Sequence, residues 1–161
     1  MRAVVDIETD AINATKIHCI VARRADTGET RHWIGDQCRE FGEWSKKIDT
    51  FIMHNGISFD APLLNKFTGS DIKVNQIDDT LIKSQLYNPI REDGHSLEAW
   101  GNFLGHKKGD YHGFATFNED MLKYCYTDTQ LTREVSAYLQ VEGEKFSEES
   151  YDLERKVRSI V

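Results

Sequence analysis

Cysteines and long apolar runs are scarce in this sequence of 161 residues, and its basic residues are fewer than its acidic ones. Its three cysteines, Cys19, Cys38 and Cys125, are an odd number without paired spacing, which argues against a disulfide framework and against a zinc site. No run approaches the roughly 18 to 20 apolar residues of a membrane span, and the N-terminus lacks the layout of a signal peptide. We therefore expect reduced cysteines and a soluble, cytosolic protein with no membrane partner.

Basic residues are outnumbered by acidic ones, 20 against 27, which gives a formal net charge of -7. Nonspecific nucleic-acid binding depends largely on lysine and arginine neutralising phosphates, so this balance excludes a simple basic nucleic-acid binder. An acidic protein can still act on phosphates if its carboxylates gather divalent cations, because these reverse the local sign of the field. The composition is therefore compatible with a metal-dependent nuclease.

The length and the 39% hydrophobic content suit one compact domain with a real core. Alternating apolar residues and turn signals predict strands over residues 3–7, 16–23 and 30–34, an antiparallel meander. Apolar spacing predicts a helix over 40–48, followed by a strand over 50–54. A further helix should begin near residues 58–62, with Pro62 in its first turn.

Capping signals mark two helices in the second half of the chain. Either Asp78 or Asp79 is expected to be the N-cap of a helix over 80–86. Ser96 is expected to cap a helix over 97–104, which Gly105 should end. The loop from 105 to 117 is predicted either to be a plain solvated loop or to face a substrate.

A long helix is predicted from Phe117 to about Gln140, because Thr116 and Glu119 have the spacing of a capping box. Residues on this helix recur at spacings of four and three, the pattern that normally faces a core. Asp128 is thus expected on an inward face. The members of this stripe are Tyr124, Asp128, Leu131, Val135 and Tyr138.

Asp6 and Glu8 interrupt an otherwise apolar run at residues 3–8. Side chains two apart in a strand share a face, and burying two unpaired acids is costly unless a cation lies between them. This spacing alone fits a metal site and a strand end whose acids reach water equally well. Asp60 is a third candidate acid, since it follows a strand end, where open α/β sheets place ligands.

Three short motifs together resemble those of the DEDD exonuclease superfamily: Asp6-x-Glu8, Asn55-x3-Phe59-Asp60 and Tyr124-x3-Asp128. The tyrosine four residues before the last aspartate, with Lys123 where a histidine would stand, resembles the tyrosine branch. A closer resemblance, over most of residues 3–139, is to the proofreading domain of family A DNA polymerases of T-seven-type bacteriophages. The segments that carry it are 54–56, 95–101, 104–105 and 108–111.

This resemblance implies an α/β ribonuclease H-like fold, a mixed central sheet with flanking helices. It also implies two Mg²⁺ or Mn²⁺ ions, for which oxygen ligands are suited. Asp6 would bridge both ions, Glu8 and Asp128 would complete the first, and Asp60 would hold the second through water. Tyr124 would orient the attacking water.

The implied activity is 3′-5′ hydrolysis of single-stranded or frayed DNA to nucleoside 5′-monophosphates, in proofreading. Two groups of residues are expected to contact the DNA. They are Thr9, Asn55 and Phe59 at the terminal nucleotide, and Lys107, Lys108 and Tyr111 along the backbone upstream.

The expected domain division is an exonuclease domain over 1–143, followed at 144–161 by an acidic linker and the start of a helix leading into a polymerase domain. A DNA polymerase domain or subunit is thus an expected partner, and a phage-encoded protein would act in the cytoplasm of the infected bacterium. Two alternatives stay open. One is an RNA-trimming exonuclease of the same superfamily, and the other is a noncatalytic module that binds DNA or a polymerase.

Overall fold

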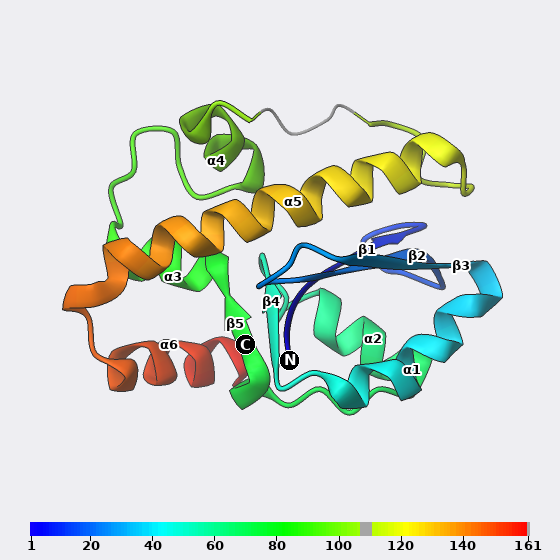
Figure 1. Ribbon diagram of the computed structural model, residues 1–161, viewed down its shortest axis with the longest axis horizontal. Helices are drawn as coiled ribbons and strands as arrows, with labels where there is room; N and C mark the ends of the chain where they lie inside the picture. Colours follow the sequence, from blue (N-terminus) through cyan, green and yellow to red (C-terminus); the bar gives the residue numbers. More distant parts are fainter. Residues whose placement is uncertain (107–110, 161) are drawn as a thin grey trace.

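A five-stranded mixed sheet with helices on both faces forms the fold in the computed structural model, which describes residues 1–106 and 111–160 (Figure 1). The strand order is β3-β2-β1-β4-β5, in which β1 pairs antiparallel with β2 and parallel with β4. The strands are β1 (Arg2–Thr9), β2 (Ile17–Arg24), β3 (Thr30–Ile34), β4 (Thr50–Met53) and β5 (Ile77–Asp79).

Helices connect and cover these strands. They are α1 (Phe41–Trp44), α2 (Asp60–Thr68), α3 (Thr80–Tyr87), α4 (Leu97–Leu104), α5 (Glu119–Glu142) and α6 (Glu148–Ile160). Short 3₁₀ helices lie at Gly35–Glu40, Ser45–Lys47, Val74–Gln76 and Gly143–Lys145. Among the helices of the described residues, none is long and apolar enough to cross a membrane.

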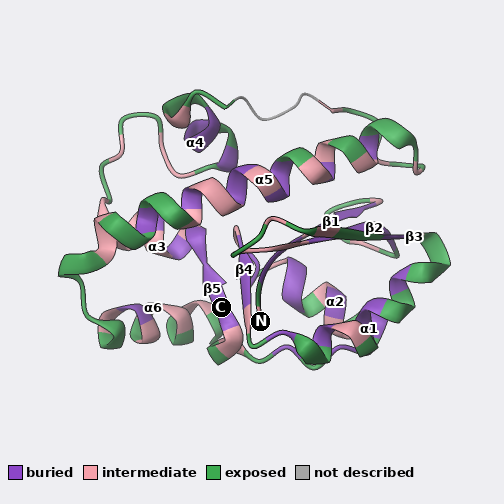
Figure 2. Cartoon of the chain, viewed as in Figure 1, coloured by how far each residue is buried: buried purple, intermediate pink, exposed green. Residues whose placement is uncertain are grey.

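The register of β1 decides which face carries its acids. Asp6 lies opposite Val21 and Glu8 opposite Cys19, and both of these β2 residues pack in one cluster with residues of α5. Ile7 lies in the other cluster, which contains α1 and α2 residues. Because alternate strand residues face opposite sides, Asp6 and Glu8 lie under α5. Exposed and buried residues alternate along that helix (Figure 2).

Local capping signals are confirmed at two helices. The Asp79 carboxylate accepts hydrogen bonds from the Leu81 and Ile82 amides at the start of α3, and Ser96 accepts one from Ala99 at the start of α4. Gly105 ends α4 in the left-handed conformation. The three cysteines are buried and free, as expected.

The helix predicted over 40–48 is wrong in its extent. The chain forms the Gly35–Glu40 3₁₀ helix, a four-residue α1 and a second 3₁₀ turn. The Ser45 hydroxyl donates to the Gly42 carbonyl oxygen at 2.7 Å, which competes with regular helical bonding. Trp33 also packs edge-on against Phe41 and Trp44, so tertiary packing sets this segment.

The capping box expected at Thr116 is also wrong. Asn118 is the N-cap of α5, because its side chain accepts a 2.9 Å hydrogen bond from the Met121 amide. Asparagine is at least as good a cap as threonine, so α5 begins at Glu119. Tyr138 is 37% exposed rather than inward, since it packs on the rings of Trp100 and Phe103 beside α4.

Candidate active site

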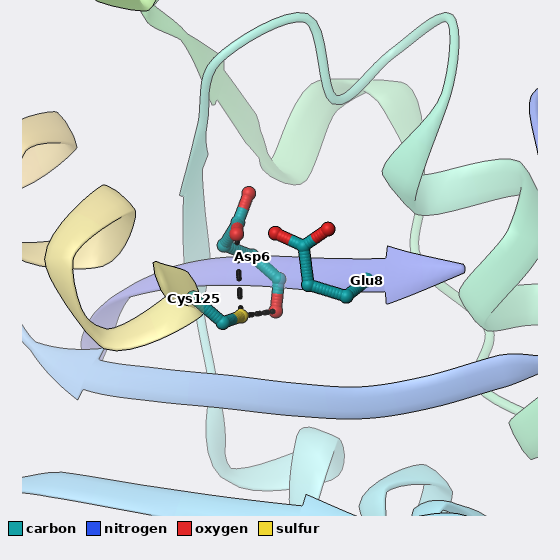
Figure 3. A group of neighbouring side chains, drawn as sticks. All are labelled: Asp6, Glu8 and Cys125. Carbon is teal, nitrogen blue, oxygen red and sulfur yellow. Dashed lines mark hydrogen bonds between the residues drawn. The ribbon is translucent and has the colours of Figure 1, made fainter. Parts of the chain in front are cut away.

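Asp6 and Glu8 project on the same side of β1, with their carboxylates side by side (Figure 3). Glu8 is buried and Asp6 is half-buried. One ligand atom each from Asp6, Glu8 and Cys125 lies within 4.8 Å of the other two. The two acids predicted to share a face therefore do so.

Cys125 links α5 to this pair. Its thiol donates to the Asp6 carboxylate at 3.2 Å and to the Asp6 carbonyl oxygen at 3.5 Å (Figure 3). Burial raises the pKa of the Cys125 thiol well above its usual value, so it remains a neutral donor. The sequence predicts only that Cys125 is reduced, and no local pattern indicates its contact with Asp6.

Asp60 is the first residue of α2 and is buried. A backbone hydrogen bond from Ile7, the residue between Asp6 and Glu8, lowers its pKa. Burial first, and then the negative charges of Asp79 and Asp128, outweigh this and raise the pKa of Asp60 to about 7. The hydrogen bond from Ile7 places Asp60 beside the acidic strand, and Asp128, whose charge acts on Asp60, is also buried.

The loop between β4 and α2 sets the place of Asp60. Asn55 has a left-handed backbone with φ 66°, and its amide donates to the Asp79 carboxylate at 3.0 Å. His54 makes a 2.8 Å hydrogen bond to the Thr80 hydroxyl. Phe59 is half-buried at the N-cap of α2 and packs against the main core.

The other residues predicted to contact DNA or the attacking water differ in how far they are buried. Thr9 is buried at the end of β1, where its hydroxyl donates to the Ala11 carbonyl oxygen at 2.9 Å. Tyr124 is half-buried, one helical turn before Asp128, and its ring lies 5.8 Å from that of Tyr111. Lys107 and Lys108 lie outside the described residues.

The acids suit hard divalent cations. Their donors are carboxylate oxygens, the ligands that Mg²⁺ and Mn²⁺ prefer. Burial, and after it the negative charges of Asp79 and Asp128, disfavours the charged form of Asp60 and raises its pKa. A cation held by Asp6, Glu8, Asp60 and Asp128 would compensate these buried negative charges, so the residues fit such an ion.

Two curated phage proteins are similar to the chain in sequence. It is 26% identical to the DNA-directed DNA polymerase of Escherichia phage T7 and 25% identical to that of Enterobacteria phage T3. Each alignment covers 80% of this chain and 25% of the polymerase. The chain is related to T7-type phage DNA polymerases. This similarity confirms the predicted resemblance. The chain spans about a quarter of the length of the two polymerases that it matches. No protein-family model matches it.

Comparison with solved structures confirms the fold of the chain. Brucella melitensis NrnC with bound Mg²⁺ aligns with a TM-score of 0.72 and 17% identity, over 99% of this chain and 80% of that one. The catalytic core of RRP6 from Trypanosoma brucei aligns with a TM-score of 0.66 and 16% identity, over 86% and 40% of the two chains. The predicted ribonuclease H-like α/β fold is confirmed.

A third structure, the family B DNA polymerase from the archaeon Pyrobaculum calidifontis, has a TM-score of 0.62 and 13% identity. The match covers 86% of this chain and 24% of that polymerase. The fold of this chain thus also occurs as a small part of a much longer protein.

Proposed function

We propose that this chain is a metal-dependent 3′-5′ exonuclease that hydrolyses single-stranded or frayed DNA to nucleoside 5′-monophosphates, and that it proofreads for a phage-type DNA polymerase. The observation that carries the proposal is that acids from three separate segments lie near the carboxyl-terminal half of β1, the central strand of the sheet. Asp6 and Glu8 come from β1, Asp60 from the start of α2 and Asp128 from α5. The hydrogen bond from Cys125 of α5 to Asp6 supports a single site, as do the effects of Ile7 and Asp128 on the pKa of Asp60.

Asp6, Glu8, Asp60 and Asp128 would hold the ions. Two Mg²⁺ or Mn²⁺ ions in such a site supply a clamp on the scissile phosphate and stabilise the attacking and leaving oxygens. Tyr124, one turn before Asp128, would orient the attacking water through its hydroxyl. Thr9, Asn55 and Phe59 would seat the terminal nucleotide.

DNA is the proposed substrate because the sequence relatives are DNA polymerases. Tyr111 lies beside Tyr124, where an aromatic ring could stack on an unpaired base. Lys107 and Lys108 would follow the backbone upstream. The proposed partner is a DNA polymerase domain or subunit, to which residues 144–161 would lead from the domain at 1–143, in the cytoplasm of an infected bacterium.

The test is degradation of a 5′-labelled single-stranded DNA with Mg²⁺ or Mn²⁺, beside the same reaction in EDTA. We expect a ladder that shortens from the 3′ end, absent in EDTA and in Asp6→Ala and Asp128→Ala. Asp120→Ala is the matched control, because Asp120 lies on α5 with its side chain 80% exposed. Tyr124→Phe should lower the rate less severely, since the metal ligands remain.

Each alternative gives a different result in this assay. Faster hydrolysis of a matched RNA oligonucleotide would indicate the RNA-trimming exonuclease, because the two substrates differ in the 2′-OH. An absence of products with either metal would indicate the noncatalytic module. Near-normal turnover by Asp6→Ala would refute the assignment of the site.

A further inference from the structure

Asp79 is a buried acid that the proposed chemistry does not use. It is the last residue of β5 and is 1% exposed. One carboxylate oxygen, Oδ1, accepts from the amides of Leu81 at 3.0 Å and Ile82 at 3.5 Å, which caps α3. A helix cap explains these two bonds and no others.

The same carboxylate also holds the loop after β4. Oδ1 accepts from the Asn55 amide at 3.0 Å, and Oδ2 accepts from the Ile57 amide at 3.1 Å. The hydroxyl oxygen of Ser96, which caps α4, accepts such a bond from the Ala99 amide. The side-chain carboxyl group of Asp79 therefore joins two segments that are 22 or more residues apart.

The loop at residues 54–59 determines the position of Asp60. Asn55 is held in the left-handed region, which is uncommon for a residue other than glycine. The loop continues into α2 through hydrogen bonds from Phe59 to the Asn55 carbonyl oxygen and from Ala61 to the Gly56 carbonyl oxygen. A shift at residues 55–57 would therefore pass directly to the start of α2.

Asp79 is itself fixed from the other side by α6. Its amide donates to the Tyr151 hydroxyl at 2.7 Å, and this hydroxyl donates to the Ile77 carbonyl oxygen at 3.0 Å. β5 is at the edge of the sheet, and α6 lies beside it (Figure 1). The carboxylate thus has a rigid base from which to hold the loop.

We propose that Asp79 is a positioning residue for hydrolysis, which holds the 54–59 loop so that Asn55 and Asp60 keep their places in the site. It acts through these two residues and touches neither substrate nor ion. The inference rests on the proposed function for its catalytic consequence. Its structural part, the fixing of the loop, stands on the hydrogen bonds alone.

The test compares Asp79→Ser with Ser96→Ala. Serine is as good an N-cap as aspartate, but it is shorter and has one oxygen, so Asp79→Ser keeps the cap of α3 and releases the loop. Ser96→Ala removes the cap of another helix, α4, and controls for lost stability. Asp79→Asn is the second variant, in case Asp79→Ser does not fold, because its amide would face the Ile57 amide donor.

Three readouts separate positioning from capping. Hydrogen exchange of the Asn55 and Ile57 amides should be on the order of tenfold or more faster in Asp79→Ser, and unchanged in Ser96→Ala. Mn²⁺ affinity without DNA, measured by calorimetry, should fall roughly 10-fold to 100-fold, as is typical when a partner behind a ligand is lost. The value of kcat at saturating metal should fall as well as the Mn²⁺ affinity, while KM for DNA changes less.

Equal effects of Asp79→Ser and Ser96→Ala on exchange at residues 55–57, Mn²⁺ affinity and kcat would overturn the proposal. A wild-type protein that binds Mn²⁺ and hydrolyses nothing would refute the proposed function alone, because exchange and Mn²⁺ affinity would still decide the role of Asp79. Faster exchange with unchanged Mn²⁺ affinity would also overturn it, since the loop would then move without displacing Asp60.

Discussion

Removing the charge of Asp60 should stabilise the metal-free protein, and increasingly so as the pH rises. Burial and the charges of Asp79 and Asp128 raise the pKa of this carboxyl from 3.8 to about 7 in the folded state. Between these values the folded state holds a proton that the unfolded chain has lost. The free energy of unfolding therefore falls as the pH rises through this window.

The magnitude follows from the two pKa values. A rise in pKa from 3.8 to about 7 lowers the free energy of unfolding by at most about 4 kcal/mol, and this loss is complete above the folded pKa. Less than half of this loss is present at pH 5. The stability advantage of Asp60→Asn over the wild type should thus grow by about 2 to 3 kcal/mol from pH 5 to pH 8.

The assay is urea unfolding in EDTA at a series of pH values, for the wild type and for Asp60→Asn. Asparagine keeps an oxygen that can accept the hydrogen bond from Ile7. Asp36→Asn, at an exposed position, controls for the loss of one acidic side chain. A stability difference that is independent of pH, or one that shrinks as the pH rises, would refute the reasoning.

Three other expectations concern the acids and their supports. Mg²⁺ or Mn²⁺ should raise the thermal midpoint of the wild type, more at pH 8 than at pH 5, and Asp6→Ala should lose this response in a thermal-shift assay. Gly56→Ala should lower the free energy of unfolding by about 1 to 3 kcal/mol, because an added Cβ would lie 2.3 Å from the Met53 Cβ; an unchanged urea midpoint would contradict this. Tyr151→Phe should lower it by about 1 to 3 kcal/mol in the same assay, because the Asp79 amide and the Ile77 carbonyl oxygen lose their buried partner. Tyr138→Phe, at a partly exposed position, is the control for that change.

Local signals in the sequence were enough for most elements of the sheet and its helices. Strand alternation gave β1, β2 and β3, and cap residues placed the starts of α3 and α4. The three-residue strand β5 was missed, because Ile77-Asp78-Asp79 reads as the approach to a helix cap. It forms because Phe51, Ile52 and Met53 of β4 supply its pairing partners. A strand this short depends on a neighbour distant in sequence.

Contacts across long sequence separations limited what could be predicted about the site. Two residues of one strand, Asp6 and Glu8, could be placed on one face from their spacing. The contact of Cys125 with Asp6 spans 119 residues, and no local pattern indicates it. The same holds for Asp79, whose cap was predicted while its bonds to the preceding loop were not. The catalytic and ligand roles themselves came from resemblance and remain predictions.

The placement of the acids also bears on how a chain of net charge -7 could approach a polyanion. Glu8, Asp60 and Asp128 are buried, so their repulsion acts in a medium that screens it poorly. Without cations, this group of acids would repel a phosphate backbone. Two divalent ions would add four positive charges there and reverse the local sign of the field. The acidity that excludes a simple basic binder would then make DNA binding at this site depend on the same ions as hydrolysis.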